Sequence, residues 1–380
     1  MQKTLTTTAL ATLLALGATA ASAEIRIGAS VSATGPAAFL GDPEAKTLEM
    51  LVEQINENGG INGEEIALTL YDDGGDPNKA RTFATRLIED DEVVAIIGGS
   101  TTGTSMSILS VSEDNEIPFI SLAGAIEIID PVKPFTFKTP HTDRMACQKI
   151  FEDMQKQGIT TIGMISGTDG FGASMQAQCK DVVGEYGITV AADETYNPTD
   201  ADMTTQLTKI RNTEGVQAVL NPGFGQGPSI VTRNYRQLAI DLPLYQSHGV
   251  ASDGFIELAG AEAAEGVRLP GTALLIADQL GADDPQKPVV DAYKTAFEEK
   301  TGTSVGTFGG YAHDAFLILT DAITRAGSAE PQAIRDAIES TSGLAGTTGI
   351  YNMSAEDHLG LDLSAFRMLE IKGGEWTVVE

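Results

Sequence analysis

The sequence is poor in positive charge, in histidine and in cysteine. Its 380 residues include 24 lysines and arginines against 53 aspartates and glutamates, which gives a formal charge of −29. Nucleic acids and anionic membrane surfaces attract basic patches, so this balance argues against both as partners. Four histidines and two cysteines leave little material for a metal site or for a scaffold of many disulfides. We therefore expect no metal and no cofactor in a globular chain that is 42% hydrophobic.

Motifs for covalent catalysis and for nucleotide binding are also missing. The chain has no G-x-S-x-G elbow, no Gly-rich loop that ends in Lys-Ser or Lys-Thr, and no G-x-G-x-x-G fingerprint. The histidines, at positions 141, 248, 313 and 358, are too scattered to indicate a catalytic triad. We expect a binding protein and no enzyme. The rival interpretation is a hydrolase that uses His248 with a neighbouring serine.

Residues 1–23 have the three parts of an export signal. Lys3 gives a positive start, residues 4–20 are small and apolar, and Ala-Ser-Ala at 21–23 has the pattern of a signal-peptidase site. The apolar run is short for a membrane helix, which needs about 20 apolar residues. We predict that a mature chain begins at Glu24 outside the cytoplasm. An uncleaved membrane anchor is the alternative.

Strand and helix patterns alternate along the rest of the chain. Residues 25–31 alternate apolar with small or polar side chains, and residues 93–97 form a β-branched run typical of a buried strand. The Asp-Pro pairs at 42–43 and 76–77 are typical of helix starts, because aspartate caps free N–H groups and proline fits the first helical position. This alternation predicts mostly parallel sheets.

The pattern restarts after Pro140, which predicts an α/β fold with two Rossmann-like lobes. Residues 285–340 are helical without strands of their own, so we expect them to pack on the first lobe and the chain to cross more than once. We assign the lobes as follows: 24–140 plus 272–348 form lobe 1, and 141–271 plus 349–380 form lobe 2.

The ends of three strands carry residues suited to a ligand. The loop at 98–103 (GGSTTG) follows a buried strand and precedes a helix, and its free N–H groups and the hydroxyls of Ser100, Thr101 and Thr102 suit a single carboxylate. Small residues also end the strands at 30–36 and 121–125. Ligands bind at the carboxyl ends of parallel strands, so we expect the three ends to converge on one site. An ordinary polar turn is the alternative for the glycine-rich loop.

Cys147 and Cys179 both fall on apolar faces of expected helices. In an oxidising compartment a disulfide between them is one interpretation, and two separate buried thiols are the other.

Nine short segments, in their order along the chain, match the pattern of a known protein family. They are 32–36 (SATGP), Gly41, 53–56 (EQIN), 59–63 (GGING), 71–73 (YDD), 97–98 (IG), 171–172 (FG), 263–267 (AAEGV) and 309–315 (GGYAHDA). This order is similar to that in leucine/isoleucine/valine-binding proteins, the type I periplasmic receptors of ABC importers. The resemblance covers nearly the whole mature chain.

The resemblance implies a type I periplasmic binding protein fold, two lobes with mostly parallel sheets joined by three crossovers. It implies a periplasmic protein, which we expect to be monomeric, that closes on a ligand and delivers it to an ABC permease in the inner membrane. The ligand would be a branched-chain or other hydrophobic amino acid. A sensor domain that passes closure to a signalling partner is a further alternative.

The resemblance also implies roles for single residues. Thr101 and Thr102, next to Ser100, would hold the ligand carboxylate. The strand end Ala123, Gly124 and Ala125 would grip its ammonium. The aromatic wall of the site would include Phe171, Phe224 and Phe39.

Three positions depart from the family pattern. Ala125 stands where a threonine is frequent, and Leu40, next to Phe39, stands where an aromatic residue is expected. His248 stands where the family usually has the acid that completes the ammonium site. A buried ammonium without an anionic partner costs several kcal/mol. The departure therefore favours, as an alternative ligand, an aromatic or other carboxylate without an amine, with a hydroxyl or keto group bonded to His248. Asp253, five residues further on, is a candidate replacement for the missing acid.

Overall fold

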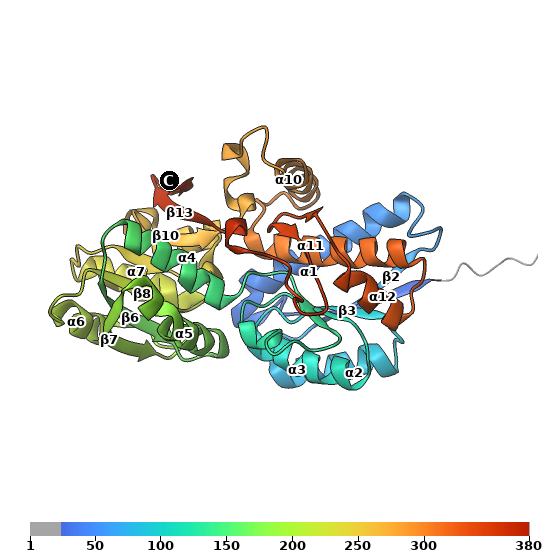
Figure 1. The fold of residues 1–380 in the computed structure, drawn as a ribbon, viewed down its shortest axis with the longest axis horizontal. Helices are drawn as coiled ribbons and strands as arrows, with labels where there is room; N and C mark the ends of the chain where they lie inside the picture. Colours follow the sequence, from blue (N-terminus) through green and yellow to red (C-terminus); the bar gives the residue numbers. More distant parts are fainter. Residues whose placement is uncertain (1–23, 380) are drawn as a thin grey trace, which may run out of the picture.

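The protein is described here by a computed structural model that covers residues 24–379. The expected signal at 1–23 lies outside the described residues. Two α/β bodies lie side by side, each around its own sheet (Figure 1). We name the body around the five-stranded sheet lobe 1 and the body around the seven-stranded sheet lobe 2. No helix among residues 24–379 has the length and apolar character that a membrane crossing requires.

Lobe 1 contains a wholly parallel sheet of order β2-β1-β3-β4-β5. Its strands are β1 (Ile25–Val31), β2 (Ile66–Asp72), β3 (Ala95–Gly98), β4 (Phe119–Ser121) and β5 (Thr136–Lys138). Its helices are α1 (Ala38–Glu57), α2 (Pro77–Glu89), α3 (Thr102–Asp114), α10 (Lys287–Thr301), α11 (Thr307–Ala326) and α12 (Pro331–Glu339), with α11 packed along α1.

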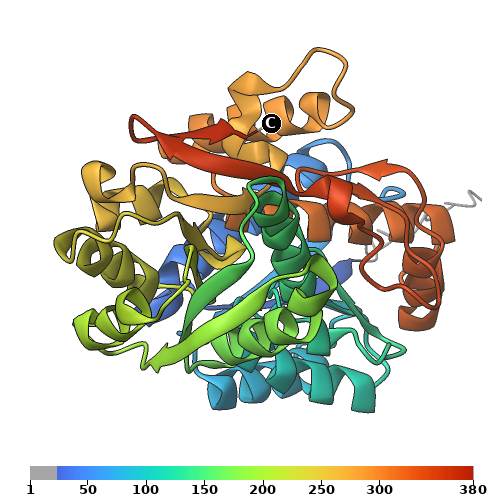
Figure 2. The ribbon, with the colours of Figure 1, turned by 60° about the vertical axis from the view of Figure 1, so that its left-hand side comes forward.

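Lobe 2 contains a sheet of order β14-β13-β10-β9-β8-β6-β7, in which only the pairs that include β13 are antiparallel. The strands are β6 (Thr161–Gly167), β7 (Thr189–Tyr196), β8 (Ala218–Asn221), β9 (Leu244–Gln246), β10 (Arg268–Gly271), β13 (Arg367–Lys372) and β14 (Glu375–Val378). The helices are α4 (Asp143–Lys156), α5 (Gly170–Val182), α6 (Thr204–Asn212), α7 (Gln226–Gln237), α8 (Asp253–Ala259) and α9 (Ala261–Ala264). Figure 2 shows the helices that cover this sheet.

The chain passes between the two sheets three times, after β5, after β10 and before β13, so the predicted fold class is confirmed. The short pair β11 (Leu344–Ala345) and β12 (Ile350–Tyr351) precedes the last passage. After residue 348 the chain still contacts lobe 1. Tyr351 Oη donates to Asp314 of α11, and His358 Nδ1 lies 2.8 Å from the Thr136 carbonyl of β5. The boundary at residue 348 stays a prediction, and these contacts favour a later one.

One of the two predicted helix starts is wrong. Asp76 does cap α2, since it accepts a hydrogen bond from Asn78 N at 2.8 Å. Pro43, however, lies inside α1, which begins five residues earlier at Ala38. Packing explains the difference: Gly41 lies so close to the residue after β1 that a Cβ there would sit 2.2 Å from the Ser32 carbonyl carbon. This contact keeps the chain helical before a residue that usually starts helices.

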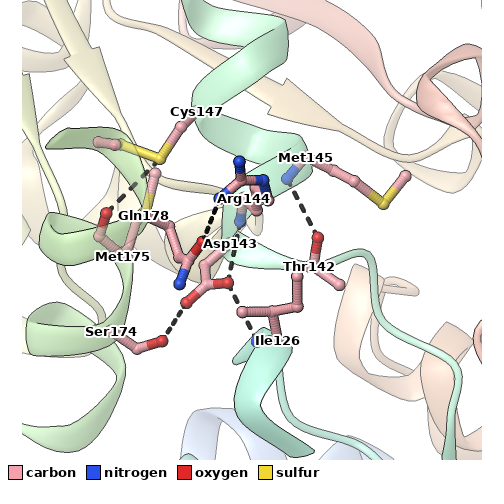
Figure 3. The surroundings of a disulfide bond; sticks show 10 residues. Ile126, Thr142, Asp143, Arg144, Met145, Cys147, Ser174, Met175 and Gln178 are labelled. Atoms are coloured by element: carbon pink, nitrogen blue, oxygen red, sulfur yellow. Dashed lines mark hydrogen bonds between the residues drawn. A yellow bond between two sulfur atoms is a disulfide. The ribbon is translucent and has the colours of Figure 1, made fainter. Parts of the chain in front are cut away.

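A disulfide joins Cys147 of α4 to Cys179 of α5, with 5.1 Å between the Cα atoms. Figure 3 shows the bond beside the N-terminus of α4, where Thr142 Oγ1 accepts a hydrogen bond from Met145 N. Both cysteines are fully buried inside lobe 2.

Replacing both cysteines with alanine should lower the free energy of unfolding by roughly 3–4 kcal/mol, because the bond closes a loop of about 33 residues. Urea unfolding of the double variant and of the oxidised parent measures the difference. Neither cysteine lines the cavity, although Phe171 lies within the closed loop, so affinity should change by less than about twofold if α5 keeps its place. Equal stabilities would contradict the prediction.

Candidate ligand-binding site

A small cavity of about 40 Å³ lies between the carboxyl ends of the two sheets. Both lobes line it, with these residues: Leu40, Ser100, Thr101, Thr102, Leu122, Ala123, Gly124, Pro140, Phe171, Phe224, His248, Gly249, Phe308 and Tyr311. A larger hollow of about 660 Å³ adjoins it and shares Thr101, Thr102, Phe171 and Phe224. Two of the three predicted strand ends, at 98–103 and 121–125, line the cavity, and the third, at 30–36, reaches only the adjoining hollow, through Pro36. Together the two spaces are large enough for a small ligand.

The N-terminus of α3 opens into this cavity. Thr101 caps the helix, since its Oγ1 accepts from Thr104 N at 3.2 Å and its own N–H donates to Thr104 Oγ1 at 3.1 Å. The N–H groups of Thr102 and Gly103 belong to the first turn, where the helix itself offers no acceptor. Free donors at the positive end of a helix make a site for an anion.

The turn before α3 needs glycine at two positions. Gly98 has a φ of +152°, and a Cβ there would lie 2.1 Å from the Ser30 carbonyl oxygen. Gly99 has a φ of +66°, and its Cβ would lie 2.3 Å from Ser105 Oγ. The two glycines bring the loop tightly over β1 and aim the helix end at the cavity.

Only one of the three loop hydroxyls is free. Thr101 uses its hydroxyl in the cap. Ser100 Oγ accepts from Ser32 N at 2.9 Å and donates to Glu44 Oε2. Thr102 Oγ1 is buried and has no partner among the described residues. The sequence predicts three available donors, because it does not show which hydroxyls the fold itself uses.

Glu44 is a buried acid that the sequence analysis missed. It lies on α1. Burial, with a smaller contribution from the charge of Asp73, raises the pKa of Glu44 to about 8, although the hydrogen bond from Ser100 acts to lower it. At neutral pH its carboxyl is therefore protonated and uncharged. Asp73 is itself held by Ser30 Oγ at 3.0 Å and by Ser32 Oγ at 2.7 Å.

Aromatic rings from both lobes form the wall. Phe171 and Phe224 of lobe 2 meet edge to face, with centroids 6.0 Å apart. Phe39 of lobe 1 lies 6.1 Å from Phe224 and 5.6 Å from Phe308 of α11. Phe39 packs behind the lining, and its neighbour Leu40 faces the cavity. These rings offer an apolar surface to a hydrophobic ligand body.

His248 lines the cavity from the end of β9 and is only 2% exposed. Its ring stands edge to face with Phe171 at 5.4 Å and with Phe366 at 5.5 Å. It covers Gly124 of lobe 1 so closely that a Cβ at Gly124 would lie 2.8 Å from His248 Nε2. His248 therefore belongs to the contact between the two lobes at the cavity.

The imidazole of His248 is neutral at physiological pH. Burial and, to a smaller extent, the charge of Lys138 lower the pKa of His248 to about 3. The nearby His141 carbonyl acts in the opposite direction and offsets only part of this lowering. Neither ring nitrogen has a partner at hydrogen-bonding distance and angle among the described residues.

The strand end at 123–125 divides between the cavity and the fold. Ala123 and Gly124 line the cavity, while Ala125 is fully buried at the start of a 3-10 turn (Ile126–Ile128) and does not. The Gly124 carbonyl accepts from Asp143 N at 3.0 Å, and the Ala125 carbonyl accepts from Lys138 Nζ at 3.3 Å.

Asp253 lies away from this site. Its Oδ1 accepts from Trp376 Nε1 at 3.1 Å, and it lines a separate hollow between α8 and β14. It is therefore not placed to replace the acid that His248 displaces. Three residues near the site went unnoticed in the sequence: Glu44, Lys138 and Tyr311. Only Tyr311, inside the GGYAHDA segment, carried a signal.

A family model described as periplasmic binding protein matches residues 24–375. Two lobes on separate, mostly parallel sheets, with a cavity between their strand ends, define the same class of fold. The chain belongs to the periplasmic binding protein family, as the resemblance predicted.

Two relatives and two solved structures illustrate the similarity. The leucine-, isoleucine-, valine-, threonine-, and alanine-binding protein of Pseudomonas aeruginosa is 27% identical over 319 residues, which cover 83% of this chain and 82% of that protein. Leu/Ile/Val-binding protein homolog 7 of Brucella melitensis is 31% identical over 234 residues, 59% of this chain and 58% of that protein. An extracellular ligand-binding receptor from Rhodopseudomonas palustris HaA2 matches with a TM-score of 0.87 and 29% identity over 94% of this chain and 100% of that one. LivJ from Streptococcus pneumoniae, solved with isoleucine, shares the fold with a TM-score of 0.83 at 21% identity, over 94% and 99%.

Proposed function

We propose that this chain is a periplasmic substrate-binding protein that captures a small hydrophobic carboxylate between its lobes and delivers it, as a monomer, to an ABC permease in the inner membrane. The observation that carries the proposal is the end of α3. Its free N–H groups and the unpartnered Thr102 hydroxyl open into a cavity that rings from both lobes enclose. Such a site neutralises an anionic group and buries an apolar body.

The names of the relatives support branched-chain amino acids as the first ligands to test. Isothermal titration calorimetry with leucine, isoleucine, valine and a set of aromatic and branched carboxylates tests the proposal. At least one carboxylate should bind in the micromolar range or tighter. A protein that binds none of them, and that raises no uptake in vesicles with a candidate permease, would overturn it.

The arrangement around His248 supports binding over hydrolysis. A hydrolase would need a nucleophile within about 3 Å of its base. Ser247 Oγ, the adjacent hydroxyl, donates instead to the Gly223 carbonyl. Neither nitrogen of His248 bonds to a serine of the described chain. Assays with esters and amides of the bound acids should show no turnover.

Thr102→Val should weaken the binding of any carboxylate ligand by roughly 1–2 kcal/mol, because it removes the one free hydroxyl at the end of α3 without changing the side-chain volume. Thr102→Ser keeps the hydroxyl and is the matched control. Calorimetry on both variants measures the difference. Equal affinities in the two variants would show that Thr102 Oγ1 does not contact the ligand.

A further inference from the structure

The strand end that would receive a ligand amine is already occupied by the chain's own groups. Lys138 Nζ, fully buried, donates to the Ala125 carbonyl at 3.3 Å, and the N–H of Asp143 donates to the Gly124 carbonyl at 3.0 Å. Of the three carbonyls at 123–125, only that of Ala123 accepts no hydrogen bond from the described residues. A second ammonium at this strand end would find one free carbonyl, that of Ala123, and would approach Lys138.

No charged side chain lines the cavity in the described part of the chain. The nearest acid behind the carboxylate loop is Glu44, which is bound to Ser100 and uncharged at neutral pH because burial raises its pKa to about 8. Asp73 is bound to two serines, and Asp253 faces another hollow. Asp169 and Asp200 line the adjoining hollow, where Asp169 accepts from Phe171 N and Gly172 N and Asp200 accepts from Asn197 N. A ligand ammonium inside the cavity itself would therefore lack an anionic partner among its lining residues.

Two polar side chains at the cavity instead lack a hydrogen-bond partner, and both suit an uncharged ligand group. His248 is 2% exposed and Tyr311 is 3% exposed, and both line the cavity. Both ring nitrogens of His248 and the hydroxyl of Tyr311 lack hydrogen-bond partners in the described protein. Buried polar groups in native proteins are nearly always bonded. Unlike the equally unpartnered ring nitrogens of His141, these atoms belong to residues that line the cavity, so a ligand group is a fitting partner for them. A neutral imidazole and a phenol offer both donors and an acceptor.

We propose that the ligand is a carboxylate without an ammonium group, an apolar or aromatic hydroxy or oxo acid whose hydroxyl or carbonyl oxygen bonds to His248 and Tyr311. The inference rests on the proposed function and narrows the substrate class of the same site. Its carboxylate binds at the end of α3, its body lies against Phe171 and Phe224, and its neutral oxygen lies near Gly124.

Matched acids of one carbon skeleton test the inference by calorimetry. We would compare leucine with its 2-hydroxy, 2-oxo and unsubstituted counterparts, and phenylalanine with phenyllactate, phenylpyruvate and 3-phenylpropionate, together with benzoate and its hydroxy derivatives. A hydroxy or oxo acid should bind at least about 100-fold more tightly than the amino acid of the same skeleton. It should also bind about 3- to 10-fold more tightly than the unsubstituted acid.

Variants separate recognition from folding. His248→Phe should reduce the preference for the hydroxy or oxo acid over the unsubstituted acid to less than about twofold, and a folding defect would instead weaken both equally. His141→Phe is the control, because His141 is an equally buried histidine that stacks on Phe366 outside the cavity lining. His248→Glu should shift the preference toward amino acids.

The outcomes are distinguishable. If an amino acid binds most tightly, the inference is overturned and the proposed function stands. If His248→Phe leaves the preference unchanged, His248 does not recognise the neutral oxygen and the inference is likewise overturned. If no carboxylate of the series binds, the proposed function is overturned as well.

Discussion

Gly124→Val should abolish ligand capture and leave both lobes folded. Gly124 lies three residues after β4 in lobe 1 and faces two rings of lobe 2, so that even a Cβ would lie 2.8 Å from His248 Nε2 and 2.9 Å from Phe171 Cε2. Real Cβ atoms do not approach so closely, and the rings have no room to retreat because each is packed against others. The valine therefore keeps the lobes apart at the ligand, and affinity should fall roughly 1000-fold, or about 4 kcal/mol.

Calorimetry and small-angle scattering measure this effect together. The radius of gyration of the parent protein should shrink when a saturating ligand is added, and that of the variant should not. Gly281→Val is the matched control, because a Cβ at Gly281 meets nothing within 4 Å and the residue lies in a loop away from the cavity. A Gly124→Val protein that still closes on ligand would disprove the contact between the lobes at this glycine.

Glu44→Gln should change how stability depends on pH. Burial raises the pKa of Glu44 from 4.5 to about 8 in the folded protein. Between these two pH values the native state holds a proton that the unfolded chain has lost, so the parent protein loses stability as the pH rises through this window. Glutamine does not titrate, so the difference between variant and parent should grow in favour of the variant, by at most about 4–5 kcal/mol at pH 8.

The measurement is the difference in unfolding free energy between variant and parent from pH 5 to pH 9. Taking the difference matters, because Lys138 titrates in the opposite sense: burial lowers its pKa to about 7, which favours the folded state as the pH rises above that value. Glu49→Gln, an exposed change on the same helix, is the control and should show a flat difference. A flat difference for Glu44→Gln would mean that Glu44 is ionised at neutral pH.

The same variant should affect binding above pH 8. Ionised Glu44 lies behind Ser100 and repels the carboxylate at the end of α3, so the parent protein should lose affinity there while Glu44→Gln retains it.

Sequence rules for helix caps and tight turns correctly predicted the features that neighbouring residues determine. Asp76 caps α2 where the Asp-Pro pair indicated, and the glycines at 98 and 99 make the turn that aims α3. Pro43 shows the limit, because the approach of Gly41 to Ser32, from another element, outweighs the preference of proline for a helix start.

The polar interior of the site could not be predicted in the same way. Glutamate and lysine are rarely fully buried, so nothing in the sequence marked Glu44 or Lys138 as interior. Ser100 and Thr101 have the right chemistry for a ligand, but long-range and capping hydrogen bonds use their hydroxyls. His248 was found because its position departs from a family pattern, a comparison that composition alone does not give.

The disulfide limits where the two lobes can bend relative to each other. It ties α4, the first helix after the chain leaves lobe 1, to α5, so this helix has to travel with lobe 2 as one rigid piece. Bending in the first connection between the lobes is then confined to the few residues between the end of β5 and Asp143. Any change in the angle between the two lobes is concentrated next to Gly124, whose carbonyl accepts a hydrogen bond from the Asp143 amide.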